Sequence, residues 1–66
     1  MEPFVKENLK AIKELFFVGL DFMSKNFGGD DLVQYAMINK RELLKLGIEE
    51  VEIDTWLLEW NRRKMI

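Results

Sequence analysis

The segment Asn39–Trp60 (NKRELLKLGIEEVEIDTWLLEW) constrains the fold of this 66-residue chain most, because it encodes two helices and the corner between them. Asn39 is suited to cap the first helix, with Glu42 in the reciprocal position of a capping box. Gly47 ends that helix, since glycine adopts the left-handed backbone conformation without steric cost, and Ile48 can then fold back onto it. Two glutamates follow, where a helix start favours acids. The corner therefore predicts an all-α fold.

The N-terminal part carries the longest amphipathic pattern of the chain. Apolar residues recur there every three or four positions, which is the period of one helix face. They are Val5, Leu9, Ile12, Phe16, Leu20, Met23 and Phe27. Gly19 lies inside this seam and costs about 1 kcal/mol against alanine in a helix, so it marks either a break or a close helix contact. Because the seam keeps its phase across Gly19, we expect one long N-terminal helix.

Two glycines at positions 28 and 29 end this helix, and Asp30 or Asp31 is suited to cap the next one. One or two short helices then follow, before a final long helix. The expected ranges are about 32–38 and 40–46 for the short helices and about 50–64 for the final one. The chain is therefore expected to form a single domain over residues 1–66, a small all-α bundle with a long helix at each end.

Composition restricts the chemistry. The chain has no cysteine and no histidine, which excludes a disulfide framework and the usual zinc sites. Its single serine, threonine and tyrosine are not accompanied by the base and orienting partner that a catalytic nucleophile needs. The pair Asp30-Asp31 is explained by the preference of helix starts for acids. We therefore expect no enzymatic activity, no cofactor, no metal and no small-molecule substrate.

Membrane segments are also not expected. No apolar run approaches the roughly 20 residues that a membrane span needs, and the N-terminus lacks the basic and apolar regions of a signal peptide. The net charge of −2 lacks the basic excess that is usual in nucleic-acid binders. We expect a soluble cytoplasmic protein without a membrane partner.

The last helix is apolar on two opposite faces. One face consists of Ile53, Trp56, Leu57 and Trp60. We expect both tryptophans to be buried against the N-terminal helix. On the other face, Val51, Leu58 and Met65 stand at seven-residue intervals, nearly two helical turns, and form a ridge. A surface helix needs only one buried stripe, so the ridge predicts a contact with a second copy or with a helical partner protein. The expected rim of this contact consists of Glu52, Asp54 and Arg62.

Phe17 departs from the pattern of the N-terminal helix, because it projects from the centre of a charged stripe. The stripe consists of Lys6, Lys10, Lys13, Glu14 and Asp21. Two interpretations are open. Phe17 either packs under the C-terminal segment of the chain, or it adds to the protein-binding residues of the last helix.

Basic residues offer an alternative function, a DNA-binding regulator. The residues it would use are Lys40, Arg41 and Lys45 on the short helix and Arg62 and Arg63 near the C-terminus. Cations at the C-terminal end of a helix also complement its dipole, so they do not require a nucleic-acid partner.

The region Leu43–Leu57 resembles the helix-turn-helix of small phage and plasmid regulators. The resemblance is carried by Leu43, Leu46, Gly47-Ile48, Ile53 and Trp56-Leu57. It implies that the second helix reads DNA, although that helix would present four acids at its start to the phosphates. The same corner is similar to the two-helix antirepressor domain of sporulation and biofilm regulators.

The region Leu15–Asn61 also resembles a sterile alpha motif domain, a five-helix interaction module. The resemblance is carried by Val18-Gly19-Leu20, Met23, Phe27, Leu43, Leu46-Gly47-Ile48 and Leu57-Leu58. It implies protein–protein interaction, and it requires a helix break at Gly19. Together these patterns favour a non-enzymatic adaptor or regulator that binds a protein partner or itself.

Overall fold

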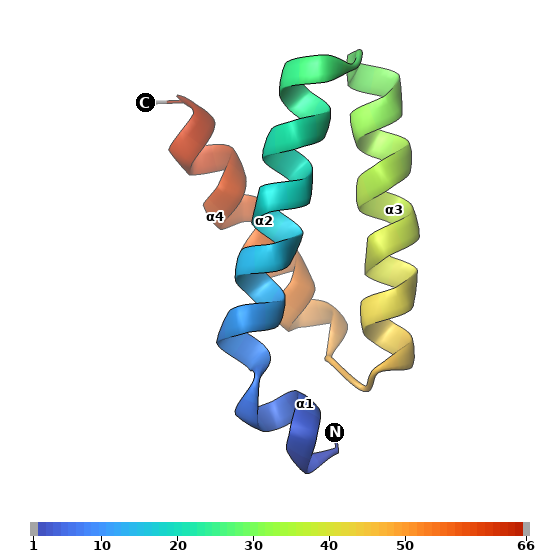
Figure 1. The fold of residues 1–66 in the computed structure, drawn as a ribbon, viewed down its shortest axis with the longest axis vertical. Coiled ribbons are helices and arrows are strands. Elements are labelled where there is room, and N and C mark those ends of the chain that lie inside the picture. Colours follow the sequence, from blue (N-terminus) through green and yellow to red (C-terminus); the bar gives the residue numbers. More distant parts are fainter. Residues whose placement is uncertain (1, 66) are drawn as a thin grey trace.

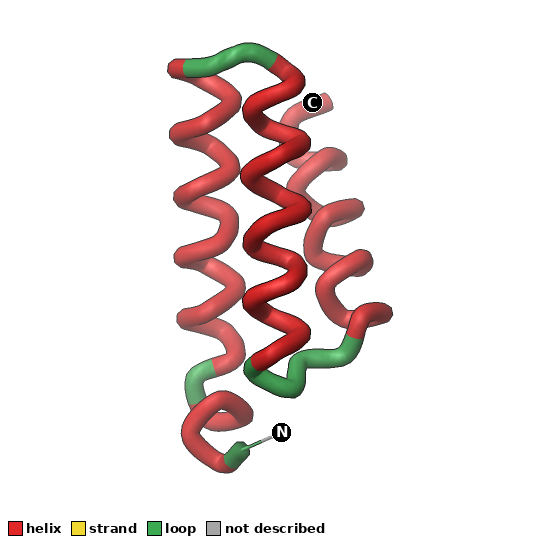
Figure 2. Tube along the Cα trace, turned by 90° about the vertical axis from the view of Figure 1, so that its right-hand side faces the viewer, coloured by secondary structure: helices red, strands yellow, loops and turns green. Residues whose placement is uncertain are grey.

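A computed structural model describes residues 2–65 of the chain. Within this range it contains four helices and no strand: α1 (Pro3–Glu7), α2 (Leu9–Asn26), α3 (Gly29–Lys45) and α4 (Glu50–Met65). α2 and α3 lie side by side as an antiparallel hairpin, and α4 crosses behind them (Figure 1). Figure 2 shows the same three helices from the side, with the short α1 below α2. The expected all-α bundle is therefore confirmed.

The corner between α3 and α4 forms as expected. Gly47 adopts a positive φ of 91°, the conformation that favours glycine. The backbone N–H of Gly47 donates to the carbonyl of Leu44 (3.0 Å), and that of Ile48 donates to the carbonyl of Leu43 (3.2 Å). These are the two hydrogen bonds of a Schellman motif, and the buried side chains of Ile48 and Leu43 belong to the same core cluster. The corner thus turns the chain back so that α4 can cover the hairpin.

The prediction of one or two short middle helices is wrong, because α3 is a single helix of 17 residues. Asn39 lies inside it, where its side-chain Nδ2 donates to the carbonyl of Tyr35 (2.9 Å) instead of capping a helix start. Asp30 and Asp31 occupy the first turn, and the N-cap position belongs to Gly28. No glycine or proline lies between Gly29 and Gly47, so nothing in the backbone ends the helix.

The N-terminal helix is continuous through Gly19, as the seam predicts, and lacks the break that the sterile alpha motif resemblance requires. It is interrupted instead at Asn8, between α1 and α2. The side-chain Nδ2 of Asn8 donates to the carbonyl of Phe4 (2.8 Å), a local bond that competes with helix continuation. The turn directs α1 so that Val5 is buried in the core.

Gly19 marks a close helix contact, one of the two possibilities that its position leaves open. The hydroxyl end of Tyr35, from α3, occupies the space beside Gly19 where a Cβ atom would stand, so a side chain added there would overlap the tyrosine hydroxyl. Glycine at this position therefore lets α2 and α3 approach closely.

Gly19→Ala is expected to lower the free energy of unfolding by about 1 kcal/mol, because overpacking costs about 1–3 kcal/mol and the better helix propensity of alanine offsets about 1 kcal/mol. Urea unfolding measures the change. Gly29→Ala is the matched control, since nothing lies within 4 Å of an added Cβ there. A Gly19→Ala variant as stable as the parent would rule out a rigid contact with Tyr35.

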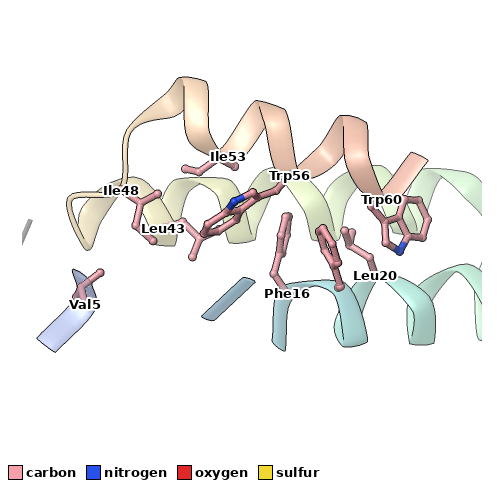
Figure 3. Close-up of a cluster of buried hydrophobic side chains, with 9 residues drawn as sticks. Val5, Phe16, Leu20, Leu43, Ile48, Ile53, Trp56 and Trp60 are labelled. Carbon is pink, nitrogen blue, oxygen red and sulfur yellow. The ribbon is translucent and has the colours of Figure 1, made fainter. Parts of the chain in front are cut away.

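The core lies between the hairpin and α4. Its buried residues are Val5, Phe16, Phe17, Leu20, Leu43, Ile48, Ile53, Trp56 and Trp60. Figure 3 shows Trp56 and Trp60 reaching from α4 toward Phe16 and Leu20 of α2. The rings of Trp56 and Phe16 pack in a tilted arrangement with centroids 6.5 Å apart. The expected burial of both tryptophans against the N-terminal helix is confirmed.

Candidate protein-interaction surfaces

Phe17 is not available to a partner, because its side chain is only 3% exposed. The guanidinium carbon of Arg63 lies 5.0 Å from the centroid of its ring, and Nζ of Lys13 lies 5.6 Å away. Both cations are paired with Glu59, at 3.1 and 3.0 Å. Phe17 therefore packs under the C-terminal segment, and the interpretation as a partner contact is wrong. Within the charged stripe, Lys13 and Asp21 contact side chains of α4, whereas Lys6, Lys10 and Glu14 are exposed.

The ridge of α4 lies on the surface. Val51 is 67% exposed and Leu58 is 59% exposed, and Glu52 and Arg62 are exposed as well. The side chain of Met65 lies outside the described part of the chain. Asp54 does not stand free on the rim, since its Oδ1 is 2.9 Å from Nζ of Lys40 on α3. The ridge is thus bounded on one side by the ion pair that joins α3 to α4.

The five cations of the DNA-binding alternative do not gather into one basic patch. Lys40 contacts the carboxylates of Asp54 and Glu50, and the hydrogen bond to Asp54 raises the pKa of Lys40 above its ordinary value. Lys45 is paired with Glu42 at 3.4 Å. Arg41 and Arg62 are exposed, and Arg63 is held by Glu59. The C-terminal end of α4 also lies far from the corner at its start (Figure 1).

Asp21 ties the end of α4 to α2. Its Oδ1 accepts a hydrogen bond from Nε1 of Trp60 and forms an ion pair with Nζ of Lys64, both at 2.9 Å. The hydrogen bond from Lys64, followed by that from Trp60, holds the pKa of Asp21 below its ordinary value of 3.8. The buried indole of Trp60 thereby has a partner for its only polar atom.

Asp21→Asn is expected to make the free energy of unfolding depend less on pH in the acidic range. The folded-state pKa of Asp21 is depressed, so the carboxylate stabilises the fold above pH 3.8, and this contribution is lost as the pH falls through the lower, folded-state value. Thermal unfolding from about pH 6 to about pH 2 should show a stability difference between parent and variant that shrinks on acidification. A difference that stays constant over this range would mean that the charge of Asp21 does not contribute.

A second apolar surface lies on α2. Leu15 is 71%, Val18 is 62% and Phe22 is 57% exposed, and we call these three residues the outer row. The ring of Phe22 lies 6.1 Å from that of Phe27, which is also exposed. The residues of the outer row are spaced by three and four positions in the sequence. In the run LFFVGL, however, Leu15 and Val18 alternate with Phe16 and Leu20 of the core seam, so the sequence does not separate the two rows.

The outer row lies on the face of the hairpin that α4 does not cover. At about 100° per residue, Phe16 points to α4, where it meets Trp56, and Gly19 points to α3, where it meets Tyr35. Going around the axis of α2 from Phe16, one reaches Gly19 first and then the outer row, so the outer row lies on the side of α2 that faces away from α4. This face is turned toward the viewer in Figure 1, and no other helix of residues 2–65 crosses it.

Two hollows interrupt the surface. A groove of about 240 Å³ between α2 and α3 is lined by Ile12, Leu15, Phe16, Tyr35, Asn39 and Leu43. The other, of about 390 Å³, is lined by Lys6, Glu7, Leu9, Lys10, Lys13, Glu52 and Trp56. The first is mainly apolar, and it adjoins the outer row through Leu15. The second mixes lysines with glutamates, so it has little preference for either sign of charge.

The described residues assemble no group with evident chemistry. The hydroxyls of Ser24 and Thr55 each donate to a backbone carbonyl, those of Asp21 and Val51. Over residues 2–65 no three acidic side chains stand close enough to hold a metal ion. In the same range no helix is both long and apolar enough to cross a membrane.

The ridge and the outer row thus have an evident capacity to bind, and Val33 and Met37 expose further apolar surface on α3. Comparison of the chain with protein-family models, with characterised proteins and with solved structures gives no match, so the surfaces must be interpreted from their own geometry.

Proposed function

We propose that this protein is a non-enzymatic protein-interaction module, an adaptor or regulator that binds a second copy or another helical protein and that works in the cytoplasm. The observation that carries the proposal is uncovered apolar surface. Leu15, Val18, Phe22, Val51 and Leu58 are each more than half exposed, and the total exposed area of polar and apolar atoms is 5053 Å², whereas a folded monomer of 7.9 kDa exposes about 4400 Å² by the usual scaling with mass. A domain of this size gains stability by sharing such surface with a partner.

Two separate surfaces support the proposal. The outer row of α2 lies on one side of the bundle, and the ridge of α4, with Val51 and Leu58, lies on the side of α4 that faces away from the core. Exposed apolar rows with charged rims are typical of protein-binding sites. Glu52 and Arg62 give the ridge such a rim, so it suits a partner helix that carries both signs of charge.

DNA binding is the second candidate function, and one observation favours it. The Gly47-Ile48 corner, which carries the helix-turn-helix resemblance, joins α3 to α4 through a glycine turn. Against it, the first turn of α4 carries Glu50 and Glu52, which would face phosphates. The cations nearest to that helix start are largely engaged with carboxylates.

Sedimentation across a range of protein concentrations, with and without duplex DNA, tests both functions. We expect the mass to rise with concentration, and we expect an affinity for duplex DNA no better than about 10⁻⁴ M at physiological salt, the level of weak non-specific binding. A chain that stays monomeric at every concentration and captures no helical protein would contradict the interaction proposal. Sub-micromolar DNA binding that is lost on substitution of Lys40 and Arg41 would establish the regulator instead.

A further inference from the structure

The outer row has the pattern of a helix-pairing seam. Ala11 and Lys25, both exposed, extend it at either end, so the residues are spaced by four, three, four and three. This alternation keeps side chains in line along one face, as in a two-helix contact. We infer that a second copy of this chain covers the outer row, with α2 packed antiparallel on α2 of the partner and the two-fold axis near Val18. The inference rests on the proposed interaction function and specifies its surface.

The exposed area matches what a second copy needs. The excess of the 5053 Å² over the expectation for a monomer is roughly 650 Å². Each partner in a standard protein–protein interface contributes about 800 Å². Covering the uncovered side of the hairpin would therefore bring the exposed surface per chain close to that of an ordinary folded protein. A two-fold interface suits this, because each copy presents the same face to the other.

Charge decides the direction of pairing. Glu14 and Lys25 flank the outer row at its opposite ends and on the same side of α2. In an antiparallel pair Glu14 of one copy comes near Lys25 of the other, twice. In a parallel pair the two Lys25 side chains would face each other across the seam, which is unfavourable, and the two Glu14 side chains would lie on opposite sides of the contact without a partner.

The groove between α2 and α3 gives the pairing a register. With the two-fold axis near Val18, Phe22 of one copy lies level with Leu15 of the other. Leu15 forms one wall of the apolar groove of about 240 Å³. The ring of Phe22 can therefore enter the partner's groove, where aromatic anchors contribute most to an interface.

The ridge of α4 is less suited to a second copy. Val51 and Leu58 are separated by Asp54, whose carboxylate is engaged with Lys40 at 2.9 Å. Closing a helix pair over that position would desolvate an ion pair, which offsets the gain from two aliphatic side chains. In the outer row three apolar side chains share one face, and Asp21, which stands between Val18 and Phe22 in the sequence, turns toward α4, where it contacts Lys64 and Trp60.

Phe22→Asp and Leu58→Asp form a matched pair of variants, since the two side chains are 57% and 59% exposed on different helices. Sedimentation equilibrium should show that Phe22→Asp weakens dimerisation at least about tenfold, which corresponds to about 1.4 kcal/mol, because the loss of a hot-spot aromatic residue commonly exceeds that amount. Leu58→Asp should leave the dimer within about twofold of the parent. Circular dichroism should show unchanged helical content in both.

Exchange of charge tests the direction. Lys25→Glu should weaken the dimer about threefold or more, and Glu14→Lys combined with Lys25→Glu should restore it. A double variant as weak as the single one would overturn the antiparallel register. A dimer that survives Phe22→Asp and dissociates on Leu58→Asp would overturn the inference while leaving the proposed function intact. A parent chain that never dimerises but captures another helical protein would do the same.

Discussion

Replacing Trp56 by alanine is expected to lower the free energy of unfolding by about 3–5 kcal/mol, which is a large part of the total for a domain of this size. Trp56 is buried, and its ring packs against Phe16 in the centre of the contact between α2 and α4. Chemical or thermal unfolding measures the loss.

Leu58→Ala is the matched control for this prediction, because Leu58 lies on the same helix but is exposed. It should change stability by well under 1 kcal/mol in the monomer. A Trp56→Ala variant that melts within a few degrees of the parent would contradict the packing of α4 on the hairpin.

Phe17→Ala should have a comparable effect, again about 3–5 kcal/mol, because a buried aromatic side chain is removed and the cavity cannot fully collapse. The loss also leaves Arg63 and Lys13 without the ring that they cover. Val18→Ala is the control, since Val18 is the next residue and is exposed. Unfolding at a concentration low enough to keep the chain monomeric separates stability from association.

The alternative interpretation of Phe17 makes the opposite forecast. A partner contact would leave the stability of the Phe17→Ala monomer unchanged and would weaken only binding. Observing that combination would contradict the burial of Phe17 beneath α4.

The features that sequence predicted best are those that depend on local stereochemistry. Gly47 was identified because a left-handed residue after a helix needs glycine, and the hydrogen bonds of Ile48 follow from that conformation. The burial of Trp56 and Trp60 followed from the period of one helix face. Neither inference required knowledge of which other element lies nearby.

The errors have a common physical origin in residues that suit two environments. Asn39, Asp30 and Asp31 have side chains that cap helices, but a helix interior or first turn also accepts them, and only the whole chain decides. Asn8 interrupts the helix between Val5 and Leu9, although the apolar spacing passes across it undisturbed.

The candidate surfaces were predictable only in part. The exposure of Val51 and Leu58 followed from their position opposite the tryptophans. The burial of Phe17 depends on Arg63, which covers its ring, and on Glu59, which pairs with Arg63. Both residues belong to α4, far away in the sequence, so the pattern of α2 alone does not predict that they cover Phe17. The outer row was equally hidden, because periodicity shows that a face is apolar but not which neighbour covers it.

The order in which the helices pack has a consequence for the kinetics of folding. The closest backbone approaches join helices that follow one another along the chain, α1 with α2, α2 with α3 and α3 with α4, whereas α4 reaches α2 through side chains such as Trp56 and Phe16. Chains with such local topology fold in microseconds to milliseconds, because little loop closure precedes each contact. The hairpin of α2 and α3 can therefore close before α4 arrives. During that interval Leu20 and Phe16 are bare on one side while the outer row is bare on the other, so the nascent hairpin is the species most prone to pair through the wrong face.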